Sequence, residues 1–127
     1  MARVVLVVDD DPMVRFVTAE YIRDCGYPAV EVADAAEAIS VLESNAEIRI
    51  VVTDINMPGD MNGLQLARYV RDTWPPVHLI ITSGLPDASR NLPSAAVYLH
   101  KPFSLLEMAA ILSRFAADGA GESQTVG

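Results

Sequence analysis

The chain has 127 residues, a single cysteine and a formal net charge of −8, and 51% of its residues are hydrophobic. This length fits one domain that can bury a core without disulfides, and Cys25 alone excludes an internal disulfide and a cysteine-based zinc site. Nine basic residues provide too little positive surface for direct binding to nucleic acid or to an anionic membrane. Because no stretch has the length of a signal-peptide core or a membrane span, we expect a cytoplasmic domain whose partners are proteins or cations.

Five apolar runs are candidate strands. Residues 3–8, 49–53 and 77–82 are nearly continuous in valine, isoleucine and leucine, and weaker runs occur at residues 29–32 and 96–99. Continuous runs are typical of strands covered on both faces in a parallel sheet.

Helical patterns separate these runs, and capping residues or turn signals bound them. We expect helices over residues 11–25, 34–45 and 63–73, and a last helix that begins at the capping box of Ser104. Only a short helix, near Asp87 to Asn91, fits between the fourth and fifth runs. Strands that alternate with helices predict an α/β fold with a doubly wound, five-stranded parallel sheet.

The domain is predicted to span residues 1–118. The last nine residues, 119–127, are small and polar, and we expect them to be a disordered tail or linker stub.

Polar groups follow the strands at their carboxyl ends. Asp9 and Asp10 follow the first run, Asp54 the third, a Thr-Ser pair (82–83) the fourth, and Lys101, the one lysine of the chain, the fifth. In open parallel sheets these ends share an edge where ligands bind. Crowded carboxylates require a cation, and their hard oxygens suit Mg²⁺, while a lysine and a hydroxyl can hold phosphoryl oxygens. The pattern predicts a Mg²⁺-dependent phosphoryl site on an aspartate.

The segments VVDDDP, TDINMP and HKPF, in this order, resemble the receiver domain of response regulators in two-component signalling, both stand-alone bacterial receivers and those of hybrid histidine kinases. The resemblance covers roughly residues 3 to 117. It implies a flavodoxin-like (βα)5 fold with strand order 2-1-3-4-5. It also implies a phosphorylation-activated switch, not an enzyme with turnover, that is phosphorylated by a histidine kinase or phosphotransfer protein and relays the signal through protein contacts.

The resemblance also implies the roles of the acidic residues. Asp54 matches the phosphoacceptor. Asp10 matches the direct Mg²⁺ ligand, with Asp9 acting beside it, and Asn56 matches the residue that offers its backbone carbonyl to the metal.

A second set of residues matches the groups that hold the phosphoryl oxygens and report them. Lys101 matches the lysine that pairs with the phosphoryl group, and Pro102 the proline whose cis peptide aims it. Ser83 matches the switch hydroxyl better than Thr82, because the family's small hydroxyl step ends at Ser83. Tyr98 matches the aromatic residue that moves with this hydroxyl.

Other interpretations share part of the pattern. A haloacid-dehalogenase-type phosphatase also has D-x-D after a strand, as in residues 9–11, but it needs an acidic pair downstream of Lys101. A flavodoxin-like nucleotide binder needs a Gly- or Ser/Thr-rich phosphate loop after its first strand, where this chain has DDDP. A degenerate receiver would keep the fold and act by protein binding alone.

Two departures from the family pattern bear on output: the loop Met57 to Gly63 is one residue longer than is common, and the fourth helix is short.

Overall fold

The computed structural model describes residues 3–85 and 91–126, with side chains of the last helix described as far as residue 116. All five predicted strands are present and pair in parallel in the order β2-β1-β3-β4-β5, which confirms the predicted topology. The strands are β1 (Val4–Val8), β2 (Ala29–Val32), β3 (Ile48–Asp54), β4 (His78–Ser83) and β5 (Val97–His100). The described helices are α1 (Pro12–Asp24), α2 (Ala35–Ser44), α3 (Gly63–Thr73) and α4 (Leu105–Val126).

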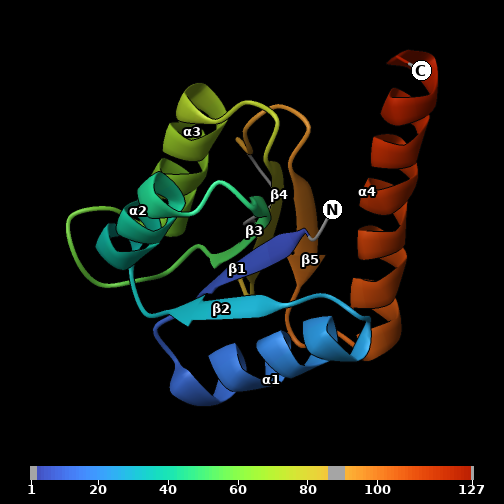
Figure 1. Cartoon of the computed structure of the whole chain (residues 1–127). Coiled ribbons are helices and arrows are strands. Elements are labelled where there is room, and N and C mark those ends of the chain that lie inside the picture. Colours follow the sequence, from blue (N-terminus) through green and yellow to red (C-terminus); the bar gives the residue numbers. More distant parts are fainter. Residues whose placement is uncertain (1–2, 86–90, 127) are drawn as a thin grey trace.

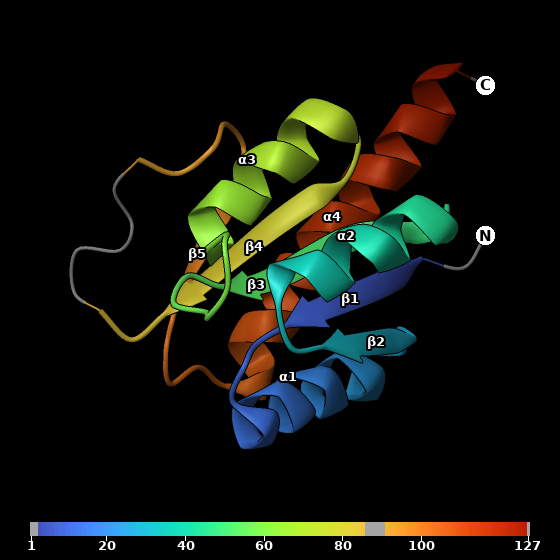
Figure 2. The ribbon, with the colours of Figure 1, turned by 90° about the vertical axis from the view of Figure 1, so that its left-hand side faces the viewer.

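Helices cover both faces of the sheet, α2 and α3 on one and α1 and α4 on the other (Figure 1). The quarter-turned view in Figure 2 shows the strands running side by side between these two layers. Alternate side chains of β1 enter different cores: Leu6 packs in the core under α2 and α3, and Val5 in the core under α1 and α4. This two-sided burial explains why the strand sequences are continuous in apolar residues.

The predicted caps set the helix starts. Asp11 accepts hydrogen bonds from the backbone of the first turn of α1, with Pro12 as the first helical residue, and Asp34 accepts one from the Glu37 N–H. Ser104 and Glu107 form the predicted reciprocal capping box at α4. Helix α3 has a capping box that was not predicted from the sequence, formed by Asn62 and Gln65.

The short helix expected near Asp87 to Asn91 falls largely on residues 86–90, which lie outside the described residues. The described residues that lead into β5 are tied to α3 by two arginines. Arg68 donates to the carbonyl of Asn91 at 3.0 Å, and Arg71 donates to the carbonyl of Ser94 at 3.1 Å.

Helix α4 continues to Val126, so residues 119–126 have helical backbone where the sequence predicts a disordered tail. Extending an existing helix orders one residue for each hydrogen bond formed, so a helix continues more easily than it starts. The division of the chain at residue 118 stays a prediction. Among the described residues, no helix is both long and apolar enough to cross a bilayer.

Candidate functional site

The candidate site lies at the carboxyl edge of the sheet, beside β1 and β3. Strand β2 lies on one side of β1 and β3 on the other, so the chain order reverses here. Such a reversal opens a crevice between the loops that leave the two strands, because these loops turn toward opposite faces of the sheet. Asp9 and Asp10 leave β1 at this edge, and Asp54 is the last residue of β3.

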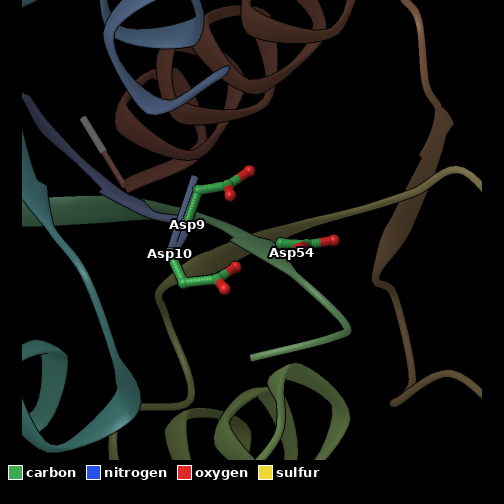
Figure 3. A group of neighbouring side chains, drawn as sticks. All are labelled: Asp9, Asp10 and Asp54. Atoms are coloured by element: carbon green, nitrogen blue, oxygen red, sulfur yellow. The ribbon is translucent and has the colours of Figure 1, made fainter. Parts of the chain in front are cut away.

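The three predicted acids are brought together. Oxygen atoms of Asp9, Asp10 and Asp54 all lie within 4.8 Å of one another, and Figure 3 shows the side chains at the neighbouring ends of β1 and β3. Asp9 and Asp54 are buried, with 4% and 8% of their surfaces exposed, while Asp10 is exposed. One carboxylate is therefore open to solvent and two are held in the edge of the core.

Lys101 reaches this cluster from the end of β5, which lies two strands from β3 in the sheet. Its Nζ donates to Asp9 Oδ2 at 2.9 Å and lies 3.2 Å from Asp54 Oδ1. Burial acts to lower the pKa of Lys101, but the hydrogen bond to Asp9 and the charge of Asp54 outweigh it, so the pKa is raised. The Lys101–Pro102 peptide is cis, as the resemblance implies.

Asp54 lies in an environment that disfavours its charge. Burial is the largest cause and raises the pKa of its carboxyl group, Lys101 opposes this, and the charges of Asp9 and Asp10 raise the pKa further. The net shift is upward although the ammonium is near. One ammonium thus neutralises the acidic cluster incompletely, and an added cation would be stabilised there.

The backbone of Asp54 is held by β4 and by the start of α3. Asp54 pairs with Thr82 in the sheet, and the next residue, Ile55, donates its N–H to the Thr82 carbonyl at 3.1 Å. The Gly63 N–H donates to the Ile55 carbonyl at 2.8 Å, and a Cβ at Gly63 would lie 2.6 Å from the Asp54 carbonyl carbon. Only glycine fits at position 63 without moving the backbone that carries Asp54.

The two candidate hydroxyls are used differently. The Thr82 hydroxyl donates to the Thr53 carbonyl at 3.4 Å. The buried Ser83 Oγ accepts from the Leu85 N–H at 3.0 Å, and its own proton donates to no acceptor among the described residues. Ser83 is also joined to the segment after β5, because the Lys101 backbone N–H donates to the Ser83 carbonyl at 2.8 Å.

Tyr98 connects the segment after β4 with β5. Its hydroxyl lies 3.3 Å from the carbonyls of both Ser83 and Leu85, and 3.1 Å from His100 Nδ1. Asn56 is exposed in the loop after β3, two residues beyond Asp54. The structure therefore gathers the acids and Lys101 directly, links Ser83 and Tyr98 through backbone carbonyls, and places Asn56 in the adjoining loop.

Three contacting residues were not identified from the sequence. The sequence predicts Gly63 only as the start of a helix, and it predicts no role in the site for Arg15 or His100. A glycine that opens a helix is a local signal of close approach. Arg15, whose guanidinium donates to the Asp9 carbonyl, and His100 have no comparable local signal, because their contacts depend on tertiary folding.

Comparison with known families agrees with this geometry. The family model described as "Response regulator receiver domain" matches residues 5–113. The chain belongs to the response regulator receiver domain family. Receivers are phosphorylation-activated modules of two-component signalling, and this chain has the fold and the acidic cluster of that family.

Two curated relatives are much longer than this receiver. It is 38% identical over 110 residues to the sensor kinase CckA of Brucella abortus, a match that covers 83% of this chain and 12% of CckA. It is 35% identical over 120 residues to the response regulator protein FleR of Pseudomonas aeruginosa, covering 91% of this chain and 25% of FleR. The chain therefore spans an eighth to a quarter of the length of these relatives.

Solved receivers have the same fold over most of the chain. A response regulator receiver protein from Sinorhizobium medicae is 30% identical with a TM-score of 0.80, covering 90% of this chain and 94% of that one. The response regulator TrrA from Thermotoga maritima, solved in complex with Mg²⁺-BeF, is 28% identical with a TM-score of 0.81, covering 89% of this chain and 98% of that one.

Proposed function

We propose that this receiver accepts a phosphoryl group on Asp54 from a histidine kinase or histidine phosphotransfer protein, and relays the signal through protein contacts. The observation that carries the proposal is the pairing of Asp54 Oδ1 with Lys101 Nζ at 3.2 Å, within a group of carboxylates at the reversal point of the sheet. A carboxylate can act as a nucleophile toward phosphorus and form an acyl phosphate.

The donor atoms of the cluster fit Mg²⁺. The convergent oxygens of Asp9, Asp10 and Asp54, all within 4.8 Å of one another, are the hard ligands that this ion takes, and it retains several waters. Exposed Asp10 is proposed as the direct ligand, together with Asp54 and the backbone carbonyl of Asn56, while Asp9 acts beside it. When bound, Mg²⁺ would neutralise charge shared by the nucleophile and the phosphoryl oxygens.

Different residues of the chain act in different parts of the phosphoryl transfer. An oxygen of Asp54 forms the new bond to phosphorus while the bond from phosphorus to the donor's histidine nitrogen breaks, and the released imidazole takes up a proton. The Lys101 ammonium and the hydroxyl proton of Ser83 are available to hold the transferred oxygens. Pro102 directs the lysine through the peptide that precedes it.

Tyr98 is proposed to report the phosphorylation. Its hydroxyl contacts the carbonyls of Ser83 and Leu85, so movement of Ser83 toward a phosphoryl oxygen alters the acceptors available to the tyrosine. A change of this kind converts a local charge into a change of surface that a partner can recognise.

Incubation with acetyl phosphate and Mg²⁺, followed by mass spectrometry, tests the proposal. We expect a labile adduct on Asp54 that is absent with EDTA and in Asp54→Asn. The matched control is Asp60→Asn, which removes an exposed acid of the neighbouring loop and leaves labelling unchanged.

Other results would identify the competing functions. An adduct on Asp9 with steady hydrolysis of p-nitrophenyl phosphate would indicate a phosphatase. The absence of both an adduct and Mg²⁺ binding would indicate a degenerate receiver that acts by protein binding alone. We also propose that this receiver acts in the cytoplasm.

A further inference from the structure

We propose that Arg15 is a positioning residue of the candidate site, because its guanidinium fixes the peptide group that joins Asp9 to Asp10. The Arg15 side chain reaches back from α1, and its terminal nitrogen donates to the backbone carbonyl of Asp9 at 2.9 Å. This inference deepens the proposed function, since it concerns how the same acids are held for a cation.

Every polar group of Asp9 has a partner. Its N–H donates to the Val32 carbonyl at 3.2 Å, Oδ1 accepts from the Asp11 N–H at 3.0 Å, and Oδ2 accepts from Lys101 at 2.9 Å. Arg15 supplies the remaining bond, to the carbonyl. Residue 9 is thus held from β2, from α1 and from the loop after β5, and the arginine provides the contact on the side facing Asp10.

The Asp9 carbonyl determines the direction in which Asp10 leaves the strand. The carbonyl of one residue and the N–H of the next lie in one rigid plane, so a bond that fixes the first also fixes the second. Asp10 is exposed, and its carboxylate makes no hydrogen bond or ion pair within the described part of the chain. Its position therefore depends on the backbone that Arg15 holds.

Arg15 is itself restrained by the edge strand. Its Nε lies 3.6 Å from Glu31 Oε1, and only 22% of the arginine side chain is exposed. The guanidinium can bind a carbonyl and face a carboxylate in fixed directions, whereas a lysine ammonium lacks this planar fork. Arg23, on the same helix, lies 3.3 Å from the other oxygen of Glu31 but has no bond to Asp9.

A plain ion pair between α1 and β2 would predict a different effect on metal binding. Arg15 is a cation close to an acidic cluster, so removal of its charge alone would strengthen the attraction for Mg²⁺. Loss of support for the Asp9–Asp10 peptide would weaken Mg²⁺ binding, because the ligands would no longer be held in place. The two effects have opposite signs.

Calorimetric titration of the full chain with Mg²⁺ distinguishes them. We expect Arg15→Met to weaken Mg²⁺ binding about tenfold, the lower bound for loss of a group that orients metal ligands. Arg15→Lys should recover only part of the affinity. The matched control, Arg23→Met, removes an equal charge and a contact to the same Glu31, and its affinity should stay within about twofold of the wild type.

A metal-free measurement provides a second readout. In EDTA, the amide resonances of Asp10 and Asp11 in ¹H–¹⁵N spectra should shift in Arg15→Met and not in Arg23→Met. If Arg15→Met does not fold, Glu31→Gln loosens the arginine without removing it, and it should shift the same two amide resonances in EDTA.

The inference is overturned if Arg15→Met folds, leaves these amides unshifted and binds Mg²⁺ as tightly as the wild type or more tightly. Its failure is separable from that of the proposed function. Normal Mg²⁺ binding by the variant, with the wild type labelled on Asp54, refutes the role of Arg15 alone. Weakened binding in the variant, without labelling of wild-type Asp54, supports Arg15 and refutes the phosphoacceptor. A wild type that binds no Mg²⁺ refutes both.

Discussion

Substitution of Gly63 by alanine has two opposing effects on the free energy of unfolding, and the structure allows their sizes to be compared. Gly63 is the first residue of α3, where helix propensity alone favours alanine by at most about 1 kcal/mol. Tertiary packing acts in the other direction, because a Cβ there would lie 2.6 Å from the Asp54 carbonyl carbon and 2.8 Å from Ile55 Cα, and closer still to the Asp54 carbonyl oxygen.

The packing effect should dominate. Ordinary contacts of a Cβ begin near 3.4 Å, and the atoms it meets here belong to the backbone, which cannot rotate away as a side chain can. Relief requires α3 and the end of β3 to separate by more than about 1 Å at the Asp54 carbonyl oxygen, and overpacking of this kind costs about 1–3 kcal/mol. The same movement strains the Gly63-to-Ile55 hydrogen bond of 2.8 Å, worth about 1 kcal/mol. We therefore expect Gly63→Ala to lower the free energy of unfolding by about 2–3 kcal/mol and Tm by roughly 10 °C.

Urea unfolding followed by circular dichroism and by Trp74 fluorescence measures this change. Gly84→Ala is the matched control, because a Cβ added at Gly84 would meet no heavy atom of the described residues within 4 Å, and the φ of this glycine is not positive. We expect the control to be as stable as the wild type. A Gly63→Ala variant that is equally or more stable would show that α3 does not approach the Asp54 backbone closely enough to clash with a methyl group.

Three further predictions concern the charges and caps, all measured by urea unfolding in EDTA. Burial raises the pKa of Asp54, so ionisation of this carboxyl group lowers the stability of the fold at pH values above its ordinary pKa of 3.8. Asp54→Asn should therefore be more stable than the wild type at pH 7 by on the order of 1 kcal/mol, and this gain should shrink as the pH falls toward 3.8. Equal stability of the two proteins at pH 7 would contradict this prediction. Lys101→Met leaves the buried Asp9 and Asp54 without the ammonium that pairs with them, and it should lower the free energy of unfolding by about 2 kcal/mol. The loss should be smaller when Asp54 is already replaced by asparagine, and equal losses in the two backgrounds would argue against the ion pair. Ser104→Ala removes the acceptor of the Glu107 N–H and should cost about 1 kcal/mol, and an unchanged unfolding midpoint would show that this cap contributes nothing.

The strands and helices could be predicted because their signals are local. The nearly continuous apolar run of residues 49–53 predicted a strand with two covered faces, and Asp34 predicted the start of α2. Local preference is weak at the end of the chain. The polar, small residues 119–126 carry no apolar face that would require a helix, yet they continue α4.

The sequence alone shows which acids, hydroxyls and lysine stand at the strand ends, and through them it indicates the family. It could do so because strand periodicity and parallel topology bring the ends of strands to one edge, whatever the details of packing. Two contacts that support these residues come from tertiary folding: the close approach of Gly63 to Asp54 and the hydrogen bond from Arg15 to the Asp9 carbonyl. Both contacts depend on how a helix packs against the end of a strand. The glycine at position 63 is a local signal of close approach, but its partner, like that of Arg15, is fixed only by folding.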